Sequence, residues 1–206
     1  MTTPLCEIMG RHGSDKGSVS GTAWHNYTPF YHSIWEARQM DALRVFELGL
    51  GTNNVDLPSN MGANGKPGAS LRGWAEYFPN SKVFGADIDR DILFHEERID
   101  TFYCDQTSAT DIAALWAQPA LAAPFDIIID DGLHRFDANV TFFENSIHKL
   151  AQGGVYIIED VRIEDIPLFS AKIGEWKQKN DVIAEIIPLA SSVNQYDNTL
   201  IMVRRN

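Results

Sequence analysis

Acidic and imidazole side chains lie in two short segments, and each segment directly follows an apolar run. These residues are Asp130, Asp131, His134, Glu159 and Asp160. If the runs 125–129 and 155–158 are neighbouring parallel strands, their ends lie about 4.8 Å apart, and the five side chains meet at one sheet edge. Crowded carboxylates repel each other unless a proton or a cation lies between them. A hard divalent ion with oxygen ligands, here expected to be Mg²⁺, relieves that repulsion. The alternative is that Asp130 or Asp160 only caps a following helix.

A divalent ion beside an imidazole suits the activation of a hydroxyl group. Two neighbouring hydroxyls can chelate the ion, which acidifies one of them. An imidazole titrates near neutral pH and can remove the proton. The oxygen then attacks a methyl carbon that is held in line with it. The cluster therefore predicts O-methyl transfer.

A glycine turn ends the expected strand at 44–50. It reads Glu47-Leu48-Gly49-Leu50-Gly51. Ligands of open α/β sheets bind outside the carboxyl ends of the strands, where glycine lets the backbone approach a ligand closely. Taken alone, the turn fits many nucleotide-binding proteins, and it fits a purely structural role equally well.

Polar residues at the next two strand ends narrow the ligand. Asp87 and Asp89 suit hydrogen bonds to ribose hydroxyls, although Asp89 is also a good helix cap. Asp105 and Gln106 are placed where an adenine edge could be read, or they form an ordinary turn. Asn54 stands where a dinucleotide motif has its third glycine. These residues favour an adenosine without a pyrophosphate, as in S-adenosylmethionine, over NAD.

Strand and helix patterns alternate along the chain. Strands are expected at 44–50, 82–88, 101–103, 125–129, 155–158, 182–189 and 199–203, and helices at 70–77, 110–116, 139–150 and 166–179. This order predicts an α/β fold with a mostly parallel, doubly wound sheet, a terminal antiparallel strand and helices on both faces. Gly153 and Gly154 are expected to end the helix at 139–150, and 52–68 is expected to be a long loop.

The predicted organisation is one globular domain in two parts. Residues 1–42 form a lid or leading helix, and residues 43–206 form the cofactor-binding domain. Ser14-Asp15-Lys16 is either a mobile lid or a solvated turn. The aromatic residues between Trp24 and Trp35 either stack on a ligand or belong to the core. His25 is given no metal role.

The composition indicates which partners and which cellular compartment to expect. The net charge of −11 argues against nucleic acid and against a polybasic membrane anchor. We expect a cytoplasmic protein for three reasons. The two cysteines lack metal-type spacing. No signal peptide is visible, and no apolar run reaches the about 20 residues that span a bilayer.

Nine short motifs together resemble those of the macrocin/mycinamicin sugar O-methyltransferase family. Cephalosporin-hydroxylase-like proteins share the same core. The motifs are SDK at 14–16, HNY at 25–27, FELGLG at 46–51, GASLR at 68–72, YFP at 77–79, GADI at 85–88, DQ at 105–106, DDGLH at 130–134 and GGVYIIED at 153–160. The resemblance covers roughly residues 10–160, and the DDGLH and ED segments are its most specific parts.

The resemblance implies a class I methyltransferase (Rossmann-like) fold, S-adenosylmethionine as donor and a sugar hydroxyl as acceptor, often in homo-oligomers. It implies Asp131, Glu159 and Asp160 as Mg²⁺ ligands and His134 as the general base, with Asp131 in the catalytic centre. Its cofactor side would comprise Glu47, Gly49, Gly51, Ser70, Asp87, Asp89, Asp105, Gln106 and Asp130. The extra N-terminal domain of mycinamicin-type members is not found in these residues, so the oligomeric state is not carried over.

Three other functions stay open on the sequence. They are a metal-independent small-molecule methyltransferase, a cofactor-binding partner protein without transfer activity, and an NAD-dependent oxidoreductase.

Overall fold

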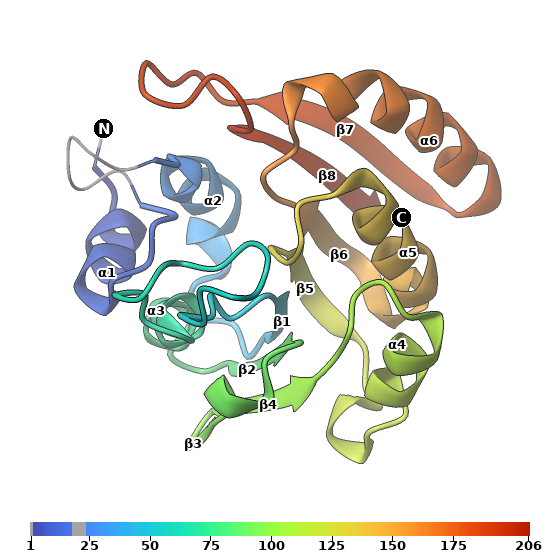
Figure 1. Ribbon diagram of the computed structural model, residues 1–206. Coiled ribbons are helices and arrows are strands. Elements are labelled where there is room, and N and C mark those ends of the chain that lie inside the picture. Colours follow the sequence, from blue (N-terminus) through green and yellow to red (C-terminus); the bar gives the residue numbers. More distant parts are fainter. Residues whose placement is uncertain (1, 18–23) are drawn as a thin grey trace.

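In the described part of the chain, eight strands share one sheet in the order β3-β4-β2-β1-β5-β6-β8-β7 (Figure 1). The computed structural model describes residues 2–17 and 24–206. The strands are β1 (Arg44–Leu48), β2 (Lys82–Asp87), β3 (His95–Glu96), β4 (Ile99–Tyr103), β5 (Phe125–Asp130), β6 (Leu150–Ile158), β7 (Val182–Pro188) and β8 (Thr199–Arg205). The helices are α1 (Pro4–His12), α2 (Tyr27–Trp35), α3 (Ala69–Tyr77), α4 (Ala109–Trp116), α5 (Phe136–Ser146) and α6 (Ile166–Lys179).

The middle of the sheet is parallel, which brings the carboxyl ends of four strands to one edge. Strand β1 pairs with β2 and with β5, and β5 pairs with β6, all in parallel. In this register Leu48 lies beside Asp130, and Asp130 lies beside Ile158. Because the strands end level with one another, the residues after them are neighbours. The predicted meeting of the two acidic segments at one sheet edge is confirmed.

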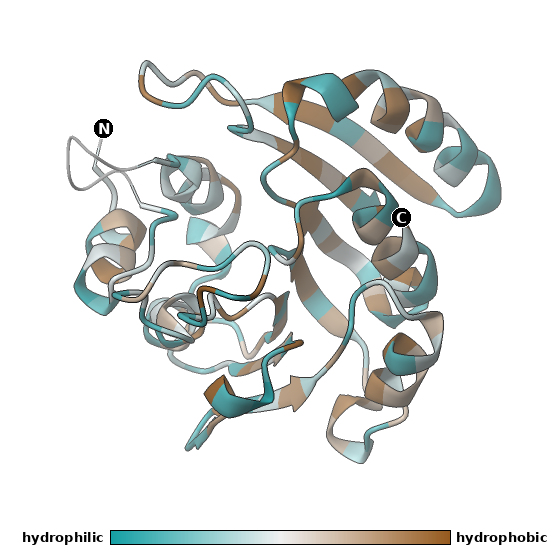
Figure 2. Ribbon diagram, in the orientation of Figure 1, coloured by the Kyte–Doolittle hydropathy of each residue, from teal (hydrophilic) through white to brown (hydrophobic). Residues whose placement is uncertain are grey.

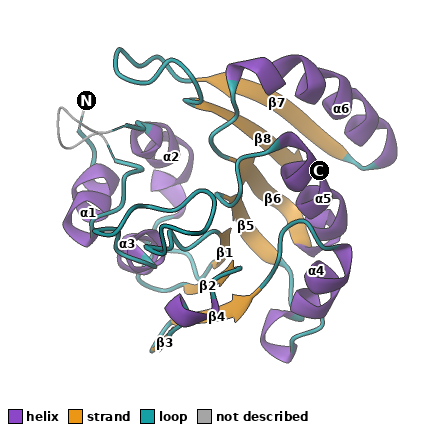
Figure 3. Cartoon of the chain, in the orientation of Figure 1, coloured by secondary structure: helices purple, strands orange, loops and turns teal. Residues whose placement is uncertain are grey.

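Helices cover both faces of the sheet, as predicted (Figure 3). Helices α1, α2 and α3 pack on one face against residues such as Val45 and Ile129, and α4, α5 and α6 pack on the other against residues such as Phe46 and Ile128. Successive strand residues point to opposite faces, so continuous apolar strands are needed when both faces are covered. Figure 2 shows that the strands in the middle of the sheet carry mostly hydrophobic residues.

The chain ends in the antiparallel pair that was expected. Strand β7 pairs with β8, and β8 pairs with β6, both antiparallel. The two-residue strand β3 and helix α1 were not predicted. Within the described ranges, no helix is both long enough and apolar enough to cross a membrane.

The prediction that Gly153 and Gly154 end a helix is wrong. Helix α5 ends at Ser146, and both glycines lie inside β6, which begins at Leu150. The register between β5 and β6 is irregular beside them, between Phe125 and Ile127, and Gly153 has a φ of +72°. Glycines in a strand commonly mark such an irregularity.

Candidate active site

A cavity opens at the shared edge, where β1, β2, β5 and β6 end. Its lining includes Gly49, Gly51, Asp87, Ile88, Asp105, Gln106, Asp131, His134 and Asp160. The loop 52–68 contributes Pro58, Ser59 and Met61 to the same wall. Eight of the predicted site residues therefore lie around one space, and the glycine turn and the acidic cluster are parts of a single site.

The glycine turn forms the floor of the cavity between β1 and β5. Gly49 has a φ of +91°, and a Cβ atom built there would lie 1.9 Å from the carbonyl oxygen of Asp131. A side chain at this position would therefore collide with the backbone that carries the acidic cluster. The glycine is needed here both for its backbone conformation and for the close approach of two strand ends.

Gly49→Ala is expected to lower the free energy of unfolding by about 3 kcal/mol or more, because it adds a collision to an unfavourable φ. Gly62→Ala is the matched control, since Gly62 has a φ of +71° and nothing within 4 Å of a Cβ. That control should cost only about 1 kcal/mol. Urea unfolding measures both, and equal losses in the two variants would refute the collision.

The residues predicted to face an adenosine are held in place by hydrogen bonds within the protein. Asp87 accepts hydrogen bonds from the backbone N–H of Leu50 (2.7 Å) and of Asp89 (2.8 Å). Gln106 donates to Asp130 (2.7 Å) and accepts from the N–H of Leu133 (2.8 Å). These bonds fix both side chains at the cavity wall. Asp105 accepts from the N–H and the hydroxyl of Thr107.

Four predicted cofactor residues lie outside the lining of this cavity. Glu47 is fully buried and accepts hydrogen bonds from Ser70 and from the Trp74 indole N–H. Asp89 caps the short helix after β2 and accepts from the Thr52 hydroxyl. Asp130 is fully buried and accepts from Gln106 and Asn139. Ser70 lines a smaller adjoining hollow. Their positions support the walls of the site from behind.

Three of the predicted catalytic and metal residues form a tight group. One ligand atom each from Asp131, His134 and Asp160 lies within 4.8 Å of the others. Nε2 of His134 is 3.5 Å from Oδ2 of Asp160. In the described part of the chain, Nδ1 of His134 is buried and has no hydrogen-bond partner. The imidazole therefore has unused capacity to exchange a proton or to bind a ligand.

Backbone strain is concentrated at this group. His134 has a φ of +55° and Asp160 a φ of +53°, which is the left-handed region that non-glycine residues avoid. Such a conformation costs on the order of 1–3 kcal/mol and persists where the surroundings hold it, often at functional sites. Both residues line the cavity.

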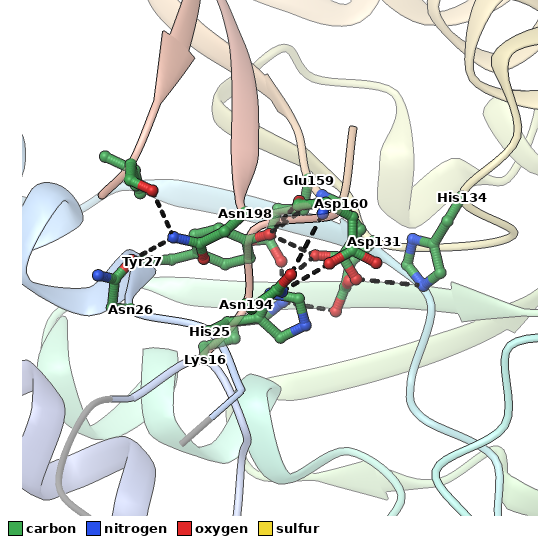
Figure 4. A network of polar contacts seen from close by, with 12 residues as sticks. Lys16, His25, Asn26, Tyr27, Asp131, His134, Glu159, Asp160, Asn194 and Asn198 are labelled. Carbon is green, nitrogen blue, oxygen red and sulfur yellow. Dashed lines mark hydrogen bonds and ion pairs between the residues drawn. The ribbon is translucent and has the colours of Figure 1, made fainter. Parts of the chain in front are cut away.

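Glu159 has other partners than the three residues above. Its side chain is 1% exposed, and its carboxylate accepts hydrogen bonds from Lys16 and from the Tyr31 hydroxyl. Lys16 Nζ also donates to Oδ2 of Asp131 at 2.5 Å and lies 3.9 Å from Oε1 of Glu47. Figure 4 shows Lys16 reaching the carboxylates from the N-terminal segment. A buried ammonium thus lies among three of the acids.

The charges in this cluster stabilise one another. Burial opposes the charge of Lys16, but Asp131, Glu159 and Glu47 outweigh it and raise the Lys16 pKa. Burial alone would raise the pKa of Asp131, but Lys16 and His134 hold it below its ordinary value. Burial raises the pKa of Asp160, with His134 acting in the opposite direction. Lys16 is therefore charged, and Asp131 is ionised and available as an oxygen ligand.

The N-terminal segment contributes more to the site than the sequence indicated. Lys16, His25, Tyr27 and Tyr31 all contact the acidic cluster. Nδ1 of His25 lies 3.3 Å from Oδ1 of Asp160 but is not aligned for a hydrogen bond. A usable signal was present: four acids converging on one edge require buried counter-charges or donors, and the SDK and HNY motifs supply them.

Known proteins are similar in sequence to part of this chain. No family model matches the sequence. The demethylmacrocin O-methyltransferase of Streptomyces fradiae is 33% identical over 158 residues, 76% of this chain and 36% of that protein. The 8-demethyl-8-(2-methoxy-alpha-L-rhamnosyl)-tetracenomycin-C 3'-O-methyltransferase of Streptomyces olivaceus is 34% identical, with the same two coverages. The chain thus spans about a third of the length of these curated relatives.

A solved structure gives the fold. The MycE methyltransferase from the mycinamycin biosynthetic pathway, in complex with Mg and SAH, matches with a TM-score of 0.71 at 24% identity. The match covers 100% of this chain and 56% of that one. The predicted class I methyltransferase fold is confirmed.

Proposed function

This chain belongs to the macrocin- and mycinamicin-type family of sugar O-methyltransferases over the segment that it shares with them, and we propose that it transfers a methyl group from S-adenosylmethionine to a hydroxyl of a sugar or sugar-bearing metabolite, with Mg²⁺ as a required ion. The observation that carries the proposal is the grouping of Asp131, His134 and Asp160 beside the glycine turn, in one cavity.

The residues around the cavity fit a methyl donor of this kind. Gly49 and Gly51 leave the floor free of side chains, and both have positive φ values. Asp87 would hold the ribose hydroxyls, and Asp105 and Gln106 would face the adenine. These groups are held at the wall by the hydrogen bonds described above, so the cavity is shaped before a ligand arrives.

The acidic cluster fits a hard divalent ion. Asp131 and Asp160 present carboxylate oxygens to the cavity, and carboxylates are the ligands that Mg²⁺ prefers. Glu159, the third expected ligand, lies directly behind them, and it joins the ion only if Lys16 releases its carboxylate. A bound ion would act as a Lewis acid on a hydroxyl of the acceptor.

His134 moves the proton in the proposed reaction. Its imidazole accepts the proton of the acceptor hydroxyl, while the hydroxyl oxygen forms a bond to the methyl carbon. The bond between sulfur and methyl breaks, its electron pair stays on sulfur, and S-adenosylhomocysteine leaves. Asp160 lies next to Nε2 of His134 and would stabilise the imidazolium that forms. The acceptor would be a small molecule that bears the sugar.

A second function is favoured by one specific contact. Lys16 already places a cation between Asp131 and Glu159, so the acids are partly neutralised by the chain itself. The same cavity therefore also suits a metal-independent methyltransferase.

Methyl transfer with and without a metal ion separates the two functions. The protein is incubated with trideuteromethyl-labelled S-adenosylmethionine and a panel of glycosides that carry neighbouring hydroxyls, in Mg²⁺ or in EDTA. We expect label on a sugar hydroxyl in Mg²⁺ and a fall on the order of 100-fold in EDTA, because a Lewis acid contributes several kcal/mol. Equal transfer in EDTA would favour the metal-independent function, and no transfer to any glycoside would contradict the proposed acceptor class.

A further inference from the structure

Helix α2 carries two tyrosines that each donate a hydrogen bond to one of two consecutive acids. The hydroxyl of Tyr27 donates to Oδ1 of Asp160 at 2.5 Å, and the hydroxyl of Tyr31 donates to Oε1 of Glu159 at 2.5 Å. Residues four apart lie on the same face of a helix, one turn above the other. The helix therefore presents a ladder of two hydroxyl donors to the end of β6.

The two acids can face one helix only because the chain bends between them. In a regular strand, successive side chains point to opposite faces of the sheet. Strand β6 ends at Ile158, and Asp160 has a φ of +53°. The N–H of Asp160 also donates to the oxygen of Tyr27, at 3.3 Å. Tyr27 thus contacts both the side chain and the strained backbone of the same acid.

The second carboxylate oxygen of each acid faces a different group. With Oδ1 of Asp160 bonded to Tyr27, Oδ2 is the oxygen that lies 3.5 Å from Nε2 of His134. With Oε1 of Glu159 bonded to Tyr31, Oε2 is the oxygen that accepts from Lys16. The hydrogen bond from Tyr27 therefore leaves Oδ2 of Asp160 to face the imidazole, and the hydrogen bond from Tyr31 leaves Oε2 of Glu159 to face a cation.

Both hydroxyls are well placed to do this permanently. Tyr27 is 1% exposed and Tyr31 is fully buried. Tyr31 also stacks on Trp35, at 5.0 Å between ring centroids, which holds its ring in place.

We propose that Tyr27 and Tyr31 are positioning residues of the metal site, which orient Asp160 and Glu159 through their hydroxyl groups. This inference rests on the proposed function, because it presumes that the acids bind a divalent ion. Hydrogen-bond partners of metal ligands typically change metal affinity by about 10–100-fold when they are removed. A purely structural role, in which the tyrosines only fix α2 to the sheet, would change stability and leave the metal affinity of the folded protein unchanged.

Tyr27→Phe removes the hydroxyl and keeps the buried ring. Titration calorimetry with Mg²⁺ should show about 10–100-fold weaker binding for this variant than for the wild type. Tyr31→Phe should weaken binding in the same direction, and it gives a second route if one variant folds poorly. Tyr77→Phe is the matched control, because Tyr77 is also fully buried but its hydroxyl pairs with Nδ1 of His32, at 2.7 Å. Binding of S-adenosylmethionine in EDTA checks that each variant keeps its fold.

The outcomes separate the inference from the function on which it rests. If the wild type binds Mg²⁺ and both phenylalanine variants bind it as tightly, the tyrosines do not position the metal site, and the proposed function is unaffected. If Tyr77→Phe weakens binding as much as Tyr27→Phe, the effect is structural and the inference is wrong. If the wild type binds no Mg²⁺, the metal part of the proposed function fails, and the inference fails with it.

Discussion

His134→Ala is expected to lower kcat by about 10²–10⁴-fold, the contribution that a positioned general base makes. His134 lines the cavity with Asp131 and Asp160, and its strained backbone holds the imidazole beside Oδ2 of Asp160. The loss should appear in kcat, because the imidazole receives the proton only as the new bond forms. Initial rates of S-adenosylhomocysteine release at saturating donor and Mg²⁺ measure it.

A surface histidine provides the control for that measurement. The His95 side chain is 76% exposed and pairs with Asp100 on the short strand pair β3–β4. His95→Ala should leave kcat within about twofold of the wild type, since exposed residues of this kind are usually near neutral. Full activity of His134→Ala would show that another group takes the proton, and His25, on the other oxygen of Asp160, would be the next one to test.

Asp131→Asn is expected to weaken Mg²⁺ binding by about 100-fold or more, and to reduce kcat/KM with it. The carboxylate of Asp131 is ionised and lines the cavity, so the amide removes a charged oxygen ligand outright. The fold should persist, because Lys16 keeps its ion pair with Glu159. Titration calorimetry with Mg²⁺, followed by assay over a range of Mg²⁺ concentrations, measures both effects.

Asp137→Asn is the matched control for the same chemical change. The Asp137 side chain is 70% exposed, at the start of α5, and lies 3.4 Å from Arg135. Its loss should leave Mg²⁺ affinity as in the wild type. If Asp131→Asn binds Mg²⁺ as tightly as Asp137→Asn does, Asp131 is not a metal ligand and Lys16 alone neutralises the acids.

The parts of the site that lie at strand ends could be predicted from the sequence. Apolar runs that lead into Gly49, Asp87, Asp130 and Glu159 point to buried strands, and parallel pairing brings such ends to one edge. The grouping of Asp131, His134 and Asp160 follows from that register. It required no knowledge of the loops.

Contacts between distant segments could not be predicted in the same way. Lys16 meets Asp131 and Glu159 across 115 and 143 residues of chain, and no local pattern fixes such a pairing. The aromatic residues of α2 looked like core or a stacking surface, and Tyr27 and Tyr31 are indeed buried. Their hydroxyl groups, which bind the acids, carry no periodic signal.

Two local signals each allowed two interpretations. Asp89 suited either a ribose or a helix cap, and the structure places its carboxylate at the cap. Gly153 and Gly154 suited either a helix end or an irregular strand. The pairs that β6 makes with β5 on both sides of them, Leu150 with Phe125 and Val155 with Ile127, carry the strand through them. Tertiary pairing overrode the local preference in the second case.

Anomalous diffraction shows whether the acidic cluster is a metal site. Crystals are grown with S-adenosylhomocysteine and Mn²⁺, and data are recorded at the manganese absorption edge. We expect one anomalous peak within bonding distance of carboxylate oxygens of Asp131 and Asp160, on the side of the cavity, with the His134 imidazole facing it. The contradicting result is a map without a peak at these residues, in which S-adenosylhomocysteine is bound and Lys16 still bridges Asp131 and Glu159.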